Sequence, residues 1–252
     1  MSASPVIRAV LAGSLAPLGK HGVPSGIFKR PLDREVTVTR SGLVGDAQGD
    51  EKHHGGPEKA VHHYPFEHYA AWMEDVPDLA VHLGRAGAFG ENISTEGMTE
   101  ANVCVGDVYR LGTVVLEVSQ ARQPCWRLNE RFELKTMARH VQESGRTGWY
   151  YRVRQEGRIG PEDRIDLLDR PAGDWPLARI LHALHRDTLN TGELMQLASL
   201  ETLTASWRDL ARRRLERHAV EDWSRRLDTP EPSRPRGDSH HKACNPRKGI
   251  SP

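Results

Sequence analysis

The chain has 252 residues, 37% of them apolar, and its 35 lysines and arginines nearly balance 34 aspartates and glutamates, which gives a net charge of +1. This balance excludes a protein whose whole surface attracts nucleic acid or an anionic membrane, so such a partner would need a local patch. No apolar run approaches the roughly 18 residues of a membrane-spanning helix, and the N-terminus lacks the positive start of an export signal, so we expect neither feature.

Residues 1–170 have the pattern of a β-rich domain. Short apolar or alternating runs are separated by glycine-containing turns, which is typical of strands. Two helices are predicted between these runs, at Glu67–Met73 and Glu133–Ser144. Many short strands with few helices predict a β-rich α+β domain built on a closed or nearly closed β-barrel. The predicted strands are Val6–Gly13, Glu35–Thr39, Asp107–Arg110, Thr113–Ser119, Arg152–Val153 and Arg164–Leu168.

Residues 171–228 change to helical spacing. A first helix runs through Arg186 with Asp174 as its predicted N-cap, and a second fits Glu193–Ala198. A third helix is predicted from Ser206 to Leu227, because Ser206 and the acidic residue three positions later resemble a weak capping box. Three amphipathic helices in this length predict a small helical domain.

Residues 229–252 differ from both domains. They contain five prolines and almost no large apolar side chains. Because such a segment cannot offset its ordering entropy by burial, we predict a disordered tail.

One short segment stands out for its chemistry, QARQPCWRLNERF at Gln120–Phe132. Positive charge near a thiol lowers its pKa and favours the thiolate, which is the nucleophilic and metal-binding form. A buried core cysteine is the alternative, and it is the role we expect for Cys104. Three cysteines without a CxxC pair predict no disulfide scaffold and favour a reducing, cytoplasmic location. The cysteine of this segment is Cys125, and its cationic neighbours are Arg122, Arg127 and Arg131.

A second segment, Gly49–Tyr69, contains five histidines. Their spacing does not reproduce the usual patterns of zinc ligands, which argues against a zinc site. The pair Gly55 and Gly56 instead favours a backbone that approaches a ligand closely, and Lys59 supplies a charge suited to phosphate. The alternative is a polar loop without a ligand.

A third segment, Gly87–Gly112, contains the sequence GAFGENIST. Gly90, Glu91 and Asn92 between apolar residues predict a turn with an inward-facing polar pair. By itself this pattern is more typical of a hairpin than of a site.

Taken in order, the stretches HHGGPEKAVHHYPFEHYAAW, GAFGENIST, VGDVYRLG and VSQARQPCWRLNERF closely resemble the MOSC domain, named from the C-terminal domain of molybdenum cofactor sulfurase. The later stretches TGWYYRV and SWRDLARRRLERHAVEDWSRRL resemble the bacterial YiiM-like branch of that family. The resemblance covers Val6 to Leu227. It implies a MOSC-type β-barrel followed by a small three-helix domain.

The resemblance also implies roles for individual residues. The single motif cysteine of the family falls on Cys125, which would ligate the molybdenum of a bound molybdenum cofactor (Mo-molybdopterin) and serve as the catalytic residue. A soft thiolate suits such a metal centre. The pterin carries a phosphate, so cationic and amide donors should line its pocket. The cofactor-binding residues expected on this basis are His54, Lys59, Tyr64, Asn92, Ser119, Arg122 and Asn129.

The YiiM-like branch is associated with the reduction of N-hydroxylated compounds, such as 6-N-hydroxylaminopurine, to amines. The resemblance therefore implies a small N-hydroxylated base or related compound as substrate. The chain has no GxGxxG motif and no cysteine cluster for iron and sulfur, so we expect electrons from a separate flavoprotein or reductase. The sequence leaves the oligomeric state open, a homodimer included. Four arginines of the third predicted helix form a candidate docking face or a merely solvated basic face: Arg208, Arg212, Arg213 and Arg214.

Two further functions remain open at this point. Cys125 could hold a persulfide or the cofactor for delivery, which would make the protein a carrier without turnover. The arginine-rich helix could bind nucleic acid, although the balanced net charge and the interleaved Glu216, Glu221 and Asp222 argue against that reading.

Overall fold

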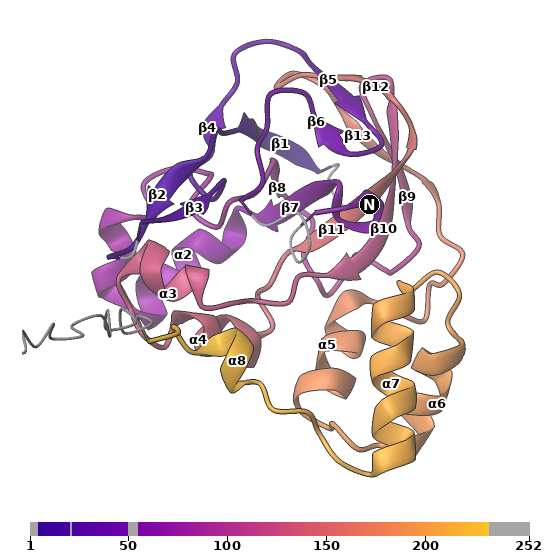
Figure 1. The fold of residues 1–252 in the computed structure, drawn as a ribbon. Helices are drawn as coiled ribbons and strands as arrows, with labels where there is room; N and C mark the ends of the chain where they lie inside the picture. The colour runs from indigo at the N-terminus through magenta and orange to yellow at the C-terminus, as the bar shows by residue number, and fades with distance from the viewer. Residues whose placement is uncertain (1–4, 21, 50–54, 232–252) are drawn as a thin grey trace, which may run out of the picture.

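The fold is a curled β-sheet domain followed by a small helical domain (Figure 1). A computed structural model describes residues 5–20, 22–49 and 55–231. The predicted β-rich α+β class with a helical C-terminal domain is confirmed, and each of the six predicted strands is present with small shifts at its ends. The strands are β1 Val6–Ala12, β2 Ala16–Leu18, β3 Val23–Ser25, β4 Arg30–Pro31, β5 Val36–Thr39, β6 Gly42–Leu43, β7 Val61–Pro65, β8 Ile93–Glu96, β9 Val108–Leu111, β10 Val114–Ala121, β11 Trp149–Gln155, β12 Gly157–Ile159 and β13 Ile165–Asp169.

Eight strands form one large sheet in the order β13-β9-β10-β11-β7-β8-β1-β4. All neighbours pair antiparallel except β7 and β8, which are parallel. Strands β12, β5 and β6 form a second sheet, and β2 pairs with β3. Within the described residues the large sheet ends at β13 and β4 without pairing them, so it is a half-barrel rather than a hydrogen-bonded closed barrel. The twist of successive strands curls it around the buried side chains.

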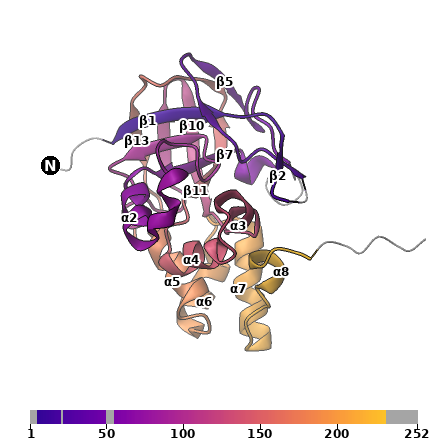
Figure 2. The same cartoon turned by 90° about the vertical axis from the view of Figure 1, so that its left-hand side faces the viewer.

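Three helices from different parts of the chain pack beside the half-barrel (Figure 2). They are α2 Glu67–Asp75, α3 Arg127–Phe132 and α4 Met137–Ser144, and two short 3-10 helices lie at Pro57–Lys59 and Pro77–Val81. The predicted helix at Glu133–Ser144 begins later, because Glu133 adopts a left-handed conformation (φ 54°) that ends α3. The side chain of Asn129 then accepts the Ala138 amide at 2.8 Å, which supplies α4 with a cap from the neighbouring helix.

The C-terminal domain contains α5 Leu177–His185, α6 Thr191–Ser199 and α7 Ala205–Arg217, followed by α8 Ser224–Leu227. One continuous hydrophobic core runs from the half-barrel into these helices and includes Trp149, Leu177, Leu184 and Trp207. The last strand of the half-barrel ends at Asp169, close to the boundary predicted at residue 170. The predicted tail lies outside the described residues from residue 232 onward. In the part of the chain that the structure describes, no helix has the length and apolar character to cross a membrane.

The third helix begins where it was predicted, but its predicted end at Leu227 is wrong, because α7 ends at Arg217. His218 takes a left-handed conformation (φ 50°), and the chain then turns back. Arg214 explains the turn: its side chain is 1% exposed and donates to the Leu184 carbonyl and to the Glu221 carboxylate. Arg214 therefore cannot belong to an exposed docking face.

Two predicted helix caps are also wrong. The N-cap of α5 is Pro176 rather than Asp174, whose carbonyl instead accepts a hydrogen bond from Arg179. The N-cap of α7 is Thr204, and Asp209 forms an ion pair with Arg212 rather than a capping box. Caps depend on the precise backbone conformation at a helix end, which sequence spacing does not fix.

His63 should make the fold sensitive to acid. Its ring is fully buried, bonded to the Tyr151 hydroxyl and Thr95 and stacked on Trp149, and burial lowers its pKa to about 3. The folded-state pKa lies below the unfolded value of about 6.5. The stabilising contribution of neutral His63 is therefore fully present above pH 6.5 and is lost as the pH drops toward 3. Between these two pH values, protonation of His63 lowers the free energy of unfolding by about 1.4 kcal/mol per pH unit.

The measurement is chemical unfolding at several pH values between 7 and 4. A His63→Gln variant should be less stable at pH 7 and show a shallower decline with acid than the wild type. His182→Gln, on the exposed side of α5, is the control and should keep the wild-type slope. An unchanged slope in His63→Gln would contradict the assignment.

Candidate functional site

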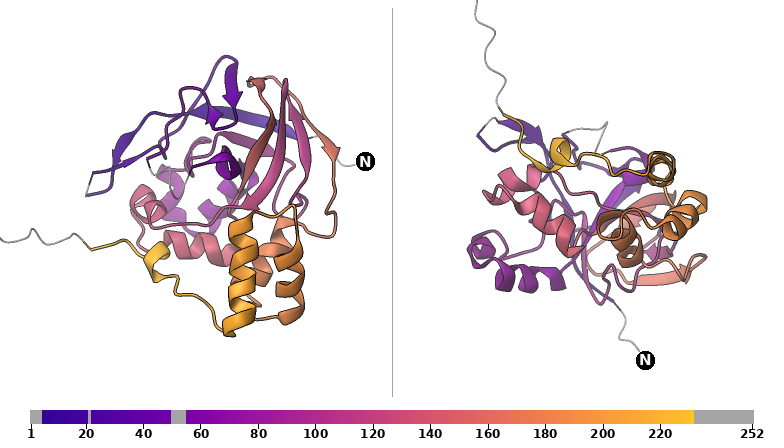
Figure 3. Two further views of the ribbon diagram at one scale, coloured as in Figure 1. Left: turned by 45° about the vertical axis from the view of Figure 1, so that its right-hand side comes forward. Right: turned by 90° about the horizontal axis from the view of Figure 1, so that it is seen from below.

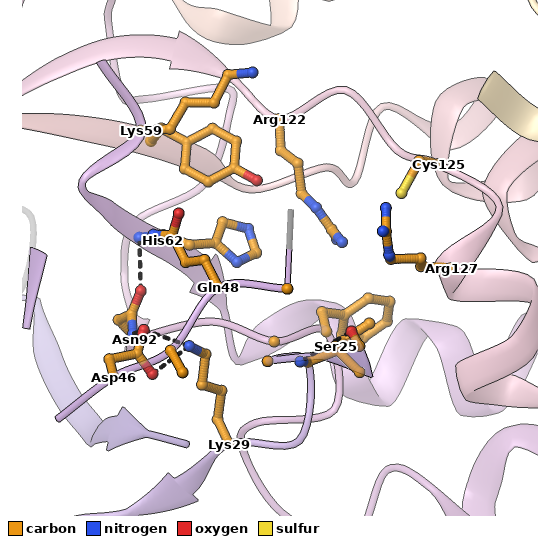
Figure 4. Close-up of a pocket in the computed structure, with 17 residues that line it drawn as sticks. Ser25, Lys29, Asp46, Gln48, Lys59, His62, Asn92, Arg122, Cys125 and Arg127 are labelled. Atoms are coloured by element: carbon orange, nitrogen blue, oxygen red, sulfur yellow. Dashed lines mark hydrogen bonds and ion pairs between the residues drawn. The ribbon is translucent and has the colours of Figure 1, made fainter. Parts of the chain in front are cut away.

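A pocket with an empty volume of about 590 Å³, which includes the open solvent at its mouth, is lined by residues of the half-barrel domain (Figure 4). Its wall combines segments far apart in the sequence: Ser25–Lys29, Asp46–Gly49, Lys59 and His62, Phe89–Asn92, Arg122–Arg127 and Tyr150.

The pocket carries an excess of positive charge. Lys29 and Asp46 form an ion pair, with each side chain only 5% exposed, and the Asn92 amide donates to the same carboxylate at 2.9 Å. Among the described residues of the wall, the remaining charged side chains are Lys59, Arg122 and Arg127, all cations. An anionic ligand therefore fits this pocket better than a neutral or cationic one.

Arg122 provides the most specific sign of a ligand. It follows β10, its side chain is 6% exposed, and it extends into the pocket (Figure 4). Its Nη1 atom has no hydrogen-bond partner among the described residues, and the same is true of Nε2 of His62 in the same wall. Buried polar atoms almost always have partners, so these two donors or acceptors are suited to a bound group.

Cys125 lies at the rim of the pocket and is 7% exposed (Figure 4). Its carbonyl accepts the Leu128 amide at 2.9 Å, which places the cysteine directly before α3. Arg127 in the first turn of that helix lies opposite the thiol and contacts the ring of Trp126. Two of the three arginines predicted beside the cysteine, Arg122 and Arg127, therefore line the pocket with it. Arg131 does not, because its guanidinium lies over the rings of Phe28 and Phe132.

The pairing of β7 with β11 decides which residues reach the pocket. Tyr150 is opposite His62, and Trp149 is opposite His63. Because successive side chains of a strand point to opposite faces, His62 and Tyr150 line the pocket while His63 and Trp149 enter the core.

The sequence-based prediction of the site missed several wall residues, among them Lys29, Asp46, His62 and Tyr150. The alternation in WYYRV was a usable signal for Tyr150, since the residues on either side of it are core residues. Burial raises the pKa of Tyr150 and lowers that of His62, so at neutral pH both side chains are uncharged and the phenol keeps its proton.

Glu91 and Gly90 shape one side of the pocket. The fully buried Glu91 carboxylate accepts the Gly87 and Phe89 amides and the Tyr69 hydroxyl. Gly90 has a φ of 76°, and a Cβ there would come within 2.9 Å of Ile27. The predicted turn is thus a fixed loop that presents a glycine backbone to the pocket.

The predicted site residues that the structure describes divide into two groups. Lys59, Asn92, Arg122 and Cys125 all line the pocket. Tyr64, Ser119 and Asn129 lie behind the wall, and His54 lies outside the described residues.

Each residue behind the wall has structural hydrogen bonds. Tyr64 accepts the Trp72 indole at 2.7 Å, and Ser119 donates to the carbonyls of Glu58 and Tyr150. Asn129 donates to the Leu227 carbonyl at 2.8 Å. These side chains therefore support the elements that carry the pocket, including the turn that bears Lys59.

The wall also limits which metals could bind. Among the residues that the structure describes, no group of three or more His, Cys, Asp or Glu side chains is arranged to hold a metal ion. A metal in this pocket would need most of its ligands from a bound cofactor, with the Cys125 thiolate as a single protein ligand.

Comparison with known proteins gives two family matches. Residues 50–166 match the MOSC domain, and residues 175–218 match the YiiM-like, 3-alpha helix domain. The chain is 40% identical to Protein YiiM of Escherichia coli (strain K12), over 82% of this chain and 92% of that protein. The crystal structure of YiiM from Escherichia coli superposes with a TM-score of 0.73 at 33% identity, covering 85% of this chain and 99% of that one.

A longer relative is also similar. A protein of Gibberella moniliformis named "Reductase" is 36% identical over 77% of this chain, and the matched region makes up 34% of that protein.

Proposed function

The chain belongs to the MOSC domain family and carries the YiiM-like 3-alpha helix domain, and from this premise we propose that it is a molybdenum-cofactor-dependent reductase of N-hydroxylated compounds, such as 6-N-hydroxylaminopurine. The observation that carries the proposal is the pocket itself, in which a buried arginine with an unsatisfied Nη1 atom faces a cationic cavity with Cys125 at its rim. The fungal relative named "Reductase" supports the reaction class.

The donor set fits the cofactor. Arg122 and Lys59 are suited to the pterin phosphate, since guanidinium and ammonium groups form strong charge-assisted hydrogen bonds with phosphate oxygens. Cys125 would supply the protein thiolate for the metal. When bound, the molybdenum cofactor supplies a centre that exchanges two electrons.

The remaining wall residues would act on the substrate and its protons. Reduction of an N-hydroxyl group takes two electrons and two protons, breaks the N–O bond and yields an amine and water. Tyr150 keeps its phenolic proton at neutral pH, so its hydroxyl can donate to an oxygen in the pocket. His62 is neutral and offers a ring nitrogen to the same space.

The electrons would come from a separate flavoprotein or reductase. The sequence lacks a GxGxxG motif, and its three dispersed cysteines cannot hold an iron–sulfur cluster. The exposed residues of α7 that remain from the predicted docking face are Arg212 and Arg213, with Arg208 half-buried.

The alternative function, a cofactor or sulfur carrier, receives less support from the pocket. A carrier that hands over sulfur needs an accessible thiol, whereas Cys125 is only 7% exposed at the rim of the pocket. The two functions differ in turnover, which is directly measurable.

The test begins with elemental analysis of protein from a host that makes molybdenum cofactor, followed by reduction of an N-hydroxylated purine with a chemical electron donor. We expect nearly one molybdenum per chain together with turnover. Molybdenum without turnover would favour the carrier, and a protein without molybdenum would contradict the proposal.

A further inference from the structure

We propose that Arg226 is a positioning residue for Cys125, and that the segment Trp223–Asp228, here called the strap, holds the Cys125 loop in place. The inference rests on the role proposed above for Cys125. The strap comes after the three-helix domain in the chain, about a hundred residues beyond the cysteine, and yet it packs beside α3 and α4.

Arg226 contacts the residues on both sides of Cys125. Its guanidinium donates from Nη1 to the Pro124 carbonyl, and its own carbonyl accepts the Trp126 amide at 2.7 Å. Each peptide that flanks the cysteine is therefore tied to the same residue. These two hydrogen bonds limit rotation of the backbone on either side of the Cα atom that carries the thiol.

The guanidinium is itself held from the other side. Its Nη2 atom donates to Oε1 of Gln142, which is a buried residue of α4. One planar side chain thus bridges α4 and the Cys125 loop, which requires the two-pronged geometry of arginine. It also lies close enough to Cys125 for an electrostatic interaction between the two side chains.

Two other residues of the strap, Leu227 and Asp228, contact α3 and α4. Leu227 is 1% exposed, and its carbonyl accepts the Asn129 side chain at 2.8 Å. Asp228 forms an ion pair with Arg139 on α4, with N–O distances of 2.8 and 3.0 Å. Asn129 acquires a role here, since it links α3 to both α4 and the strap.

The course of the chain explains why α7 must stop early. After α7 the chain runs away from the helical domain, and the short yellow helix α8 lies apart from α7 and next to α3 and α4 (Figures 1 and 3). A continuous helix to Leu227 would carry Arg226 away from Pro124. The turn at His218 is therefore what allows the end of the helical domain to reach the site.

The test compares Arg226→Gln with Arg225→Gln in the full chain. Arg225 is the adjacent residue of α8, is exposed and serves as a matched control. The readouts are hydrogen exchange of the Trp126 amide, molybdenum content, and the rate constant for alkylation of the Cys125 thiolate by iodoacetamide. This constant is obtained from the pH dependence of the rate, so that a changed thiolate fraction does not affect the comparison. For Arg226→Gln we expect at least about tenfold faster exchange, at least about threefold faster alkylation and reduced molybdenum, with Arg225→Gln at wild-type values.

Two further variants keep the proposal falsifiable if Arg226→Gln folds poorly. Gln142→Ala removes only the anchor of the guanidinium and should shift exchange and alkylation in the same direction by a smaller factor. Arg139→Gln removes only the ion pair of Asp228, whose two side chains are exposed, so it contributes little to holding the strap. This variant leaves the contacts of Pro124 and Trp126 intact and should leave both readouts unchanged. The proposal would be overturned if Arg226→Gln showed wild-type exchange and alkylation. It would also be overturned if Arg139→Gln changed both rates as much as Arg226→Gln does.

Failure of the strap and failure of the proposed function are distinguishable. Loss of molybdenum in Cys125→Ser, combined with wild-type exchange and alkylation in Arg226→Gln, would refute the strap alone. Altered exchange in Arg226→Gln, combined with full molybdenum in Cys125→Ser, would refute the metal-ligand role and leave the strap as a device that orders the loop.

Discussion

Replacing Cys125 with serine is expected to reduce bound molybdenum to background and to abolish reduction of N-hydroxylated substrates. Cys125 is the only thiol that lines the pocket within the described residues, and a hydroxyl is a much harder ligand than a thiolate. The half-barrel should remain folded, because the side chain lies at the rim of the pocket and the substitution barely changes its volume. Elemental analysis measures the bound molybdenum, turnover with a chemical electron donor measures the activity, and thermal unfolding measures the stability of the fold.

Cys104→Ala is the control for this prediction. Cys104 is buried at the junction with the helical domain, where its thiol contacts the Gly173 carbonyl, and it does not line the pocket. That variant should keep its molybdenum, although it should unfold at a lower temperature because a core side chain is shortened. Full molybdenum content in Cys125→Ser would end the proposal that this thiolate ligates the metal.

Replacing Arg122 with glutamine should weaken retention of the cofactor by a factor of about ten to a hundred. A hydrogen bond to a charged group is worth about 1.5–3 kcal/mol, which corresponds to that range of affinity. The effect should exceed that of Lys59→Gln, because Arg122 is almost fully buried and less screened by water than the half-buried lysine. The measurement is the rate at which molybdenum and pterin are lost during dialysis.

Arg110→Gln is the matched control, since Arg110 is an exposed residue of β9 outside the pocket wall. It should retain the cofactor as the wild type does. Equal retention in Arg122→Gln and Lys59→Gln as well would show that the phosphate lies elsewhere.

The secondary structure could be predicted where the pattern of the sequence is local. The six predicted strands alternate or run apolar between glycine turns, and each is present. β7 was missed because all five of its residues are buried although two are histidines and one is tyrosine, so its composition looked like that of a polar loop. The ring nitrogens of His63 find their partners on other strands, in Tyr151 and Thr95, which no local pattern reveals.

The candidate site could be predicted only in part. Arg122, Cys125 and Arg127 come from one short segment, so their proximity was evident from the sequence, and the structure places all three in the pocket wall. Lys29 and Asp46 form their ion pair between two early segments, and Asn92 from a third segment joins them. That arrangement depends on the close approach of Gly26 to the Ala47 carbonyl, where a Cβ would lie only 1.8 Å away.

The sequence by itself therefore determined the β-rich domain, the helical domain and the cysteine among arginines, because alternation, helical spacing and neighbouring charges all act over a few residues. Only the tertiary structure decided which strands pair, that Tyr150 and His62 share one face, and that Arg226 returns to bracket Cys125. These arrangements depend on hydrogen bonds and burial between segments far apart in the chain. Their free energy is gained only when the whole core assembles, so no single stretch of sequence encodes them.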